Sequence, residues 1–173
     1  MTAPVIIQDY DPIWPQQFDT LRSRIAAVLG PLATSIDHVG STAVPGLAAK
    51  PIIDLDILIR TAADLPLVIT RLASLGYEHR GDLGIKGREA FRAPADVFAH
   101  HLYVCPPSSQ EYRRHIAFRN HLRTHLQDAT AYANLKRQLA VKFGAEREKY
   151  NEAKAEFVEE ILCRAPNHLT APA

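Results

Sequence analysis

The chain has 173 residues, of which 47% are hydrophobic and 23% are charged, and its formal net charge is +1. This length suits one domain with a substantial core, and the composition is that of an ordinary globular protein. The near-zero charge excludes a global electrostatic attraction to nucleic acid, so any preference for phosphate must come from a local patch. We expect residues 1–165 to form a single domain and residues 166–173 to form a flexible tail.

The N-terminal residues and the cysteines favour a cytoplasmic protein. The first residues contain acids and prolines, where a secretory signal has a basic start and a long apolar run. No apolar stretch approaches the roughly 20 residues that a membrane span needs. Cys105 and Cys163 form no metal or redox motif, which favours free thiols. We therefore expect a cytoplasmic location and no membrane contact.

The hydrophobic pattern predicts helices and strands in mixed order. Apolar residues at helical spacing predict a helix through Phe18–Leu29, which Gly30 and Pro31 end. Downstream, the same reading predicts strands at 34–40, 51–59, 77–80, 89–93 and 98–105, a helix at 61–76, and helices at 109–127 and 128–163. This order predicts an α+β fold with a small mixed sheet, packed helices and a C-terminal pair of long helices.

Two aspartates interrupt an apolar strand in the segment PIIDLDILI. Residues two apart on a strand face the same side, so Asp54 and Asp56 project together while their apolar neighbours face the core. Paired carboxylates repel unless a cation lies between them, and Mg²⁺ is bound in this way by one or two carboxylates together with phosphates and water. Pairing with Lys50 or an arginine is the structural alternative, and the spacing alone leaves both open.

The turn ahead of this strand has the chemistry of an anion site. Gly40 permits a positive φ or a close backbone approach, and Ser41 and Thr42 add hydroxyl groups. Successive backbone N–H groups in such a turn can form a nest for an anion. A phosphate beside a metal-binding carboxylate pair is typical of phosphoryl- or nucleotidyl-transfer sites.

The segment HVGSTAVPGLAAKPIIDLDILI, at 38–59, resembles the signature of the GrpB family, also numbered UPF0157, in the nucleotidyltransferase superfamily. The resemblance continues through GIKGREAFR at 84–92, HHLYV at 100–104 and AFRNHLRTH at 117–125. It implies a nucleotidyltransferase-like core followed by C-terminal helices. It also implies that Gly40 and Ser41 hold phosphate and that Asp54 and Asp56 are catalytic metal ligands. The family occurs fused to dephospho-CoA kinase, which implies a link to coenzyme A.

The chain departs from the superfamily pattern at the third carboxylate. The expected strand supplies His100 and His101, and the nearest acid, Asp96, lies upstream in a loop. His101 is the better candidate to join the metal site, because Leu102 and Val104 share the face of His100. Histidine is a poor ligand for Mg²⁺, so this change favours Mn²⁺ or Zn²⁺, or binding without turnover. Further departures are Tyr103, where the family more often has histidine, and Asn120, where it more often has aspartate.

Basic residues supply candidate phosphate contacts. Lys86 and Arg88 lie in a glycine-rich hairpin, where basic residues are usually solvated, and the resemblance raises the expectation that both contact phosphate. Lys50 is placed either to pair with Asp54 or to reach a phosphate. His38 is expected to be a hydrogen-bonded core residue. The basic helix around residues 111–125 is expected to be a solvated face, with phosphate or nucleic-acid binding as the alternative, and its His121 and His125 lack further metal ligands.

The leading hypothesis is a nucleotide-binding protein with a divalent metal, Mg²⁺ or Mn²⁺ with Zn²⁺ as a further option, that transfers a nucleotidyl group to an unidentified acceptor. A second hypothesis is a non-catalytic phosphate-binding or regulatory module linked to coenzyme A. A third is an RNA-binding protein that uses the basic helix, which the near-neutral charge disfavours. The sequence does not decide between enzyme and binding module.

Overall fold

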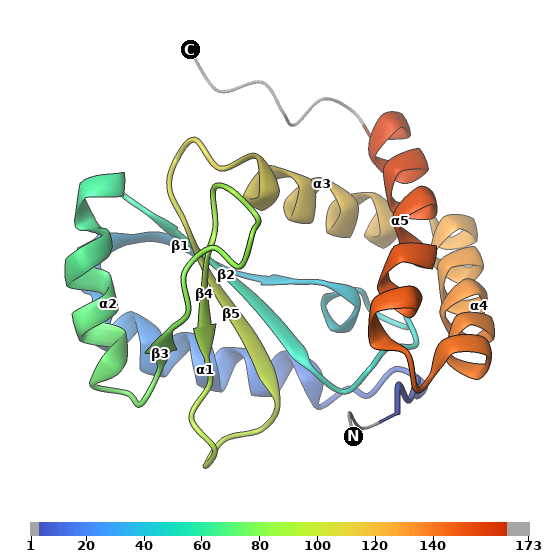
Figure 1. Cartoon of the computed structure of the whole chain (residues 1–173), viewed down its shortest axis with the longest axis horizontal. Coiled ribbons are helices and arrows are strands. Elements are labelled where there is room, and N and C mark those ends of the chain that lie inside the picture. The colour runs from blue at the N-terminus through green and yellow to red at the C-terminus, as the bar shows by residue number, and fades with distance from the viewer. Residues whose placement is uncertain (1–3, 166–173) are drawn as a thin grey trace.

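A computed structural model describes residues 4–165 of the chain (Figure 1), so the predicted tail at 166–173 lies outside the described residues. The helices are α1 (Trp14–Leu29), α2 (Leu65–Ala73), α3 (Gln110–Thr124), α4 (Leu126–Phe143) and α5 (Arg147–Arg164). The strands are β1 (Ala33–Val39), β2 (Ile53–Ile59), β3 (Glu78–His79), β4 (Glu89–Arg92) and β5 (His100–Cys105). The predicted α+β class is confirmed. Among the described residues, no helix combines the length and the hydropathy that a membrane crossing requires.

The strands form one mixed sheet in the order β1-β2-β5-β4-β3. β2 lies parallel to β5 and antiparallel to β1, and β4 lies antiparallel to both β5 and β3. Because side chains alternate along a strand, Leu55 and Ile57 of β2 enter the core while Asp54 and Asp56 face the other side. The predicted common face of the two aspartates is therefore confirmed.

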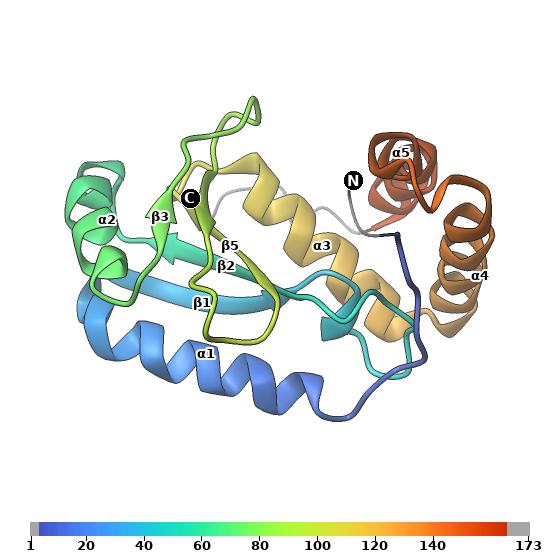
Figure 2. The same cartoon turned by 60° about the horizontal axis from the view of Figure 1, so that its bottom comes forward.

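Helices cover the two faces of the sheet (Figure 2). α1 and α2 pack on the core face, where Trp14, Ile25 and Leu72 join the strand residues in a buried cluster. α3 crosses the opposite face, which carries the aspartates. α4 and α5 pack against each other beside the loop that joins β1 to β2, and a second apolar cluster joins them to that loop.

The single helix predicted at 128–163 is wrong, because the chain turns between α4 and α5 at residues 144–146. Gly144 is a weak helix former, and Glu146 leaves the helical region with φ −116° and ψ 76°. The carbonyl of Gly144 instead accepts a hydrogen bond from the N–H of Val5, at 2.9 Å. The tertiary contact with the N-terminal segment thus stabilises a break that helical periodicity alone did not predict.

α2 is also shorter than predicted. A 3-10 turn at Ala62–Asp64 precedes it, and Pro66 lies in its first helical turn, where a missing N–H is harmless. Its C-terminal end follows the prediction, since Gly76 has a positive φ of 86° and the N–H of Tyr77 returns to the carbonyl of Leu72 at 3.2 Å. The helix therefore has the glycine stop that the sequence indicated, with a later start.

Candidate functional site

The Gly-Ser turn lies directly against the first aspartate. The chain leaves β1 at Gly40, which has φ 70° and ψ −171°, and continues as a 3-10 turn over Ser41–Ala43. A Cβ atom at Gly40 would lie 2.2 Å from Oδ2 of Asp54. Only glycine suits both this backbone conformation and this contact. The turn and the aspartate therefore form one packed unit.

Thr42 and His38 support the turn from inside the protein. The Thr42 hydroxyl lies 2.9 Å from Nε2 of His38 and donates to the carbonyl of Ile52 at 3.3 Å. The His38 ring stacks on Phe18, with ring centroids 4.7 Å apart, and burial lowers its pKa to about 4. His38 is thus a neutral core residue, as expected. Thr42, a predicted phosphate ligand, uses its hydroxyl for internal contacts.

Each aspartate of β2 is paired with a histidine. Oδ1 of Asp54 lies 2.8 Å from Nδ1 of His101 on β5, and Oδ2 of Asp56 lies 2.7 Å from Nδ1 of His115 on α3. These partners replace Lys50 or an arginine, which was the structural alternative. His101 faces the aspartates because it lies opposite Asp54 in the parallel register.

Asp56 is the more unusual of the two carboxylates. It is fully buried, and its Oδ1 has no hydrogen-bond partner among the described residues. Burial raises the pKa of Asp56 above its ordinary value. Burial also acts to lower the pKa of His115, but the hydrogen bond and charge of Asp56 outweigh it, so the pKa of His115 is raised. The pair therefore shares a charge-assisted hydrogen bond in a buried setting.

A third aspartate, which the sequence reasoning missed, faces the same side from β1. Asp37 lies opposite Asp56 in the antiparallel register. Its Oδ2 accepts hydrogen bonds from the Tyr112 hydroxyl at 2.8 Å and the Ser35 hydroxyl at 2.5 Å, and its Oδ1 lies 3.6 Å from Arg119. The period of two in SIDHV could have indicated it, but only once the pairing of β1 with β2 was known.

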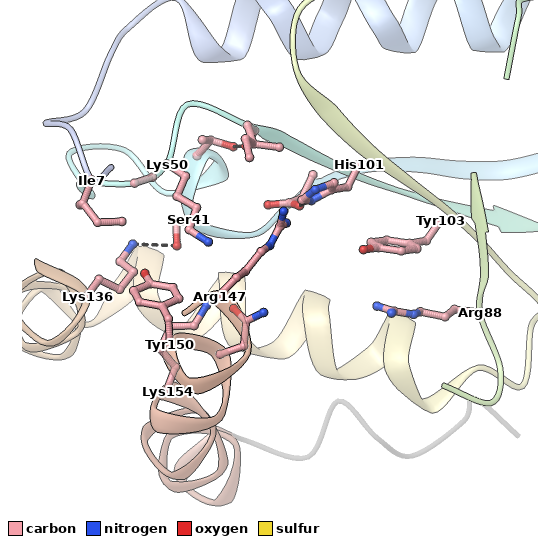
Figure 3. A pocket seen from close by; sticks show the side chains of 15 residues that line it. Ile7, Ser41, Lys50, Arg88, His101, Tyr103, Lys136, Arg147, Tyr150 and Lys154 are labelled. Carbon is pink, nitrogen blue, oxygen red and sulfur yellow. Dashed lines mark hydrogen bonds and ion pairs between the residues drawn. The ribbon is translucent and has the colours of Figure 1, made fainter. Parts of the chain in front are cut away.

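A pocket of about 330 Å³ opens beside Asp54 (Figure 3). The N-terminal segment, the Gly-Ser turn, β2, β5, the loop before β4, and helices α4 and α5 all contribute to its walls. The lining residues are Ile7, Ser41, Thr42, Ala49, Lys50, Ile52, Asp54, Arg88, His101, Tyr103, Lys136, Arg147, Tyr150, Asn151 and Lys154. We call this the main pocket. It brings together most of the predicted site residues and adds several from α4 and α5.

The wall of the main pocket near α4 and α5 is strongly basic. Lys50, Lys136, Arg147 and Lys154 line it together. The Nζ atoms of Lys50 and Lys154 lie 4.5 and 4.6 Å from the centre of the Tyr150 ring. Burial, aided by the neighbouring cations, lowers the pKa of all three lysines, to about 7 for Lys136 and about 8 for Lys154. Positive charge gathered in this way favours an anionic ligand.

Lys136 links α4 to the Gly-Ser turn. Its side chain is buried, and its Nζ donates to Oγ of Ser41 at 2.8 Å and to the carbonyl of Ala48 at 2.5 Å. Because Lys136 is the donor in this bond, Ser41 accepts it and keeps its own proton for another acceptor. Sequence reasoning missed Lys136. The available signal was its place on the apolar face of α4, between Tyr132 and Leu139.

Arg88 and Tyr103 form the other end of the main pocket. The guanidinium carbon of Arg88 lies 4.2 Å from the centre of the Tyr103 ring, and Nε of Arg88 is buried with no partner among the described residues. A second pocket of about 200 Å³ adjoins this end and is lined by Val39, Gly40, Asp54, Arg88, Tyr103 and His115. Lys86 is exposed on the loop between β3 and β4 and lines neither pocket.

The basic helix α3 supports the turn. Arg119 donates to the carbonyl of His38 at 2.9 Å, and Arg123 donates to the carbonyl of Ala43 at 2.9 and 2.7 Å. A third arginine of α3 pairs with Glu159 of α5. The expectation of a purely solvated face is therefore wrong for Arg119 and Arg123, because they fix the loop that carries Gly40.

Other polar residues singled out from the sequence lie outside both pockets. His100 faces the core and lies 2.8 Å from the Tyr77 hydroxyl. His121 and His125 stack with centroids 3.9 Å apart, and Nε2 of His121 lies 2.6 Å from Asp128. Asp96 lies in the loop before β5, and Asn120 accepts hydrogen bonds from Arg119. Within residues 4–165, no three histidine, cysteine, aspartate or glutamate side chains converge in a way that could hold a metal ion.

Known proteins are similar to this chain in sequence. The chain is 36% identical to a UPF0157 protein of Halalkalibacterium halodurans, over 94% of the chain and 83% of that protein. It is 34% identical to the UPF0157 protein YqkA of Bacillus subtilis, over 87% of the chain but 44% of that protein. It is also 38% identical, over 43% of the chain, to 19% of a dephospho-CoA kinase of Mycolicibacterium paratuberculosis.

Two solved structures have folds similar to that of this chain. The crystal structure of the conserved protein GrpB from Enterococcus faecalis matches with a TM-score of 0.83 and 34% identity, covering 92% of this chain and 96% of that one. The Cid1 poly(U) polymerase in its MgGTP-bound form matches with a TM-score of 0.52 and 13% identity, covering 78% and 44%. The fold is thus that of the nucleotidyltransferases. The sequence model of the GrpB protein matches residues 4–164, and the chain belongs to the GrpB family.

Proposed function

We propose that the main pocket binds a nucleotide or a related phosphate compound together with a divalent metal ion, and that the protein transfers a nucleotidyl group. The observation that carries this proposal is the division of charge in the pocket: Lys50, Lys136 and Lys154 line the wall near α4 and α5, and Asp54 lies in the sheet beside it. A polyphosphate chain matches this arrangement, because its oxygens suit the cations and a metal ion can join it to the carboxylates. The nucleotidyltransferase fold supports the proposal.

The chain's own residues have distinct roles in this proposal. Ser41, fixed as a hydrogen-bond donor by Lys136, binds a phosphate oxygen beside the backbone of Gly40. Lys50 and Arg147 neutralise the remaining phosphate charge. Arg88 lies at the end near Asp54, where it lines both pockets. These contacts hold the nucleotide with its phosphates directed toward the aspartates.

Asp54 and Asp56 are the residues that would hold the metal ion. The unpartnered, buried Oδ1 of Asp56 is the observation that supports a cation here, because a bound cation would compensate this oxygen. Two carboxylates with phosphate and water suit Mg²⁺ or Mn²⁺, whereas Zn²⁺ would need the free Nε2 of His101 as a further ligand. When bound, the ion would stabilise the negative charge on the transferred phosphoryl group.

A non-catalytic phosphate-binding module is the second candidate. The observation that favours it is that His101 and Tyr103 occupy the face of β5 beside the aspartates, so β5 supplies no third carboxylate. The partial similarity to a dephospho-CoA kinase directs this candidate toward coenzyme A and its precursors. RNA binding by α3 is the weaker idea, because Arg119 and Arg123 already bind backbone carbonyls.

A thermal-shift screen tests the proposal. The purified chain is heated with Mg²⁺, Mn²⁺ or Zn²⁺, with and without ATP, CTP, GTP, UTP or coenzyme A. A ligand at 100 times its Kd adds about 2.7 kcal/mol to the native state, which corresponds to a Tm increase of roughly 5–10 °C for a domain of this size. We expect a metal-dependent increase with one nucleotide.

Matched variants locate the ligand. The Tm increase should disappear in the double variant Asp54→Asn/Asp56→Asn. In Lys154→Met, the affinity for the nucleotide should fall at least tenfold. Lys86→Met changes a lysine outside both pockets and should behave as wild type. An increase with coenzyme A alone, independent of metal, would support the non-catalytic module. The absence of any nucleotide effect would contradict the proposed function.

A further inference from the structure

We propose that the second pocket binds the acceptor of the transferred group, and that this acceptor is a small molecule whose reacting group is a carboxylate or phosphate oxygen. This inference rests on the proposed function, because it names the second substrate of the same reaction. The pocket shares Asp54, Arg88 and Tyr103 with the main pocket, so its occupant lies next to a ligand bound there.

Arg88 gives the second pocket its preference for an anion. The guanidinium carbon lies over the Tyr103 ring, 4.2 Å from its centre, and this cation–π contact restrains the group. Its Nε is buried and has no partner within the described part of the chain. A buried cationic donor without a partner is costly unless a ligand supplies the acceptor, and a carboxylate or phosphate matches the geometry of a guanidinium group.

His115 provides the second polar contact. Asp56 occupies its Nδ1, at 2.7 Å, so Nε2 is the ring nitrogen available to a ligand. The Oε2 atom of Glu111 lies 3.9 Å from this Nε2, too far for a hydrogen bond. Four residues complete the walls: Asp54 and Tyr103, which the main pocket shares, and Val39 and Gly40, which carry no polar side-chain group. The site thus suits a compact ligand with one anionic end and a short carbon body.

The volume of the pocket limits the size of the acceptor. About 200 Å³ corresponds to roughly seven water molecules at about 30 Å³ each. Drug-sized ligands usually occupy about 300–1,000 Å³, which is more than this pocket encloses. The size therefore favours a small acid or a small phosphate ester over the end of a polynucleotide.

The chemistry of the walls favours an acceptor oxygen that is already ionised. Among the lining residues the only carboxylate is Asp54, and its Oδ1 is engaged by His101. A hydroxyl acceptor would need Nε2 of His115 to take its proton, whereas a carboxylate or phosphate oxygen is already ionised and pairs with the Arg88 guanidinium, so it can react without a base. That oxygen forms a bond to the α-phosphorus of the nucleotide, the bond from this phosphorus to the pyrophosphate oxygen breaks, and pyrophosphate leaves with the electron pair. The reaction requires no proton transfer.

Residue-resolved NMR tests this site. Inorganic phosphate and acetate are titrated separately into the full chain at constant pH, while the ring C–H resonances of His115 and His101 are followed. We expect both anions to move the His115 resonance in a saturable manner, with at least tenfold weaker binding in Arg88→Gln. Lys154→Met and Lys86→Met should leave this affinity within twofold of wild type, because neither residue lines the second pocket.

The two proposals can fail separately. An unchanged His115 resonance, or equal anion affinity in Arg88→Gln and wild type, would overturn the acceptor site even if a nucleotide stabilises the protein. Conversely, a response of His115 without any nucleotide-dependent Tm increase would overturn the proposed transfer reaction and with it the assignment of the occupant as an acceptor. If acetate fails and phosphate binds, the acceptor is narrowed to phosphate compounds.

Discussion

The contact between Gly40 and Asp54 makes a quantitative prediction for the variant Gly40→Ala. The added methyl group would lie 2.2 Å from Oδ2 of Asp54, and the backbone there has φ 70° and ψ −171°, a region that almost only glycine adopts. The conformational strain costs about 1–3 kcal/mol. The forced contact adds about 1–3 kcal/mol, because the carboxylate or the turn must move. We therefore expect a destabilisation of about 2–6 kcal/mol.

Gly46 offers a matched control within the same loop. It has a similar φ of 78°, but a Cβ there would meet nothing within 4 Å, so Gly46→Ala carries only the backbone strain. The free energy of unfolding is measured by urea denaturation for both variants. The difference between the losses of unfolding free energy in the two variants gives the cost of the contact with Asp54, about 1–3 kcal/mol.

A double-mutant cycle checks the same contact directly. Combining Gly40→Ala with Asp54→Ala should recover most of that difference, since the clashing carboxylate is then absent. Equal stabilities for Gly40→Ala and Gly46→Ala, together with additivity in the cycle, would refute the reasoning. The turn and the aspartate would then be independent, and the packed unit described above would not exist.

Three further predictions concern buried polar groups. Burial lowers the pKa of Lys136 from 10.5 to about 7, so the unfolded chain binds more protons between these values and stability should rise with pH there, by up to about 1.4 kcal/mol per pH unit. Urea titrations from pH 7.5 to 9.5 should show this contribution in wild type and not in Lys136→Met. His115→Ala leaves the buried Asp56 without its partner and should lower the free energy of unfolding by about 3–5 kcal/mol. His115→Asn keeps a donor near the position of Nδ1 and should lower it clearly less. Equal losses in the two variants would contradict the importance of the bond to Asp56. Arg123→Ala removes two hydrogen bonds to the carbonyl of Ala43 and should cost about 1.5–3 kcal/mol, with a loss below 0.5 kcal/mol arguing against support of the turn.

The sheet side of the site could be predicted from the sequence because it depends on local rules. The period of two along a strand placed Asp54 and Asp56 together, and the same rule separated His101 from His100. The need for glycine at position 40 followed from the turn chemistry. These inferences use neighbours in the chain, where steric constraints act without knowledge of the fold.

The helical side of the site could not be predicted in the same way. His115 lies 59 positions after its partner Asp56, and Lys136 lies 95 positions after Ser41. Their meeting depends on how α3 and α4 cross the sheet, which helical periodicity does not specify. The break before α5 depends likewise on the hydrogen bond from Val5 to Gly144. Lys86 shows that closeness in sequence does not place a residue in the site: it lies two residues from Arg88, but it is exposed and lines neither pocket.

The wide spread of the pocket walls along the chain has a consequence for protein synthesis. Every member of the buried core cluster on the sheet lies between Trp14 and Val104, so this part of the nascent chain can collapse early. The main pocket also needs Lys136 and Lys154, which the ribosome adds after the core residues. At about 5–20 residues per second, some 3–10 seconds separate these events. A nascent chain would thus hold a folded sheet before it can bind any ligand, and ligand binding would report that translation has passed α5.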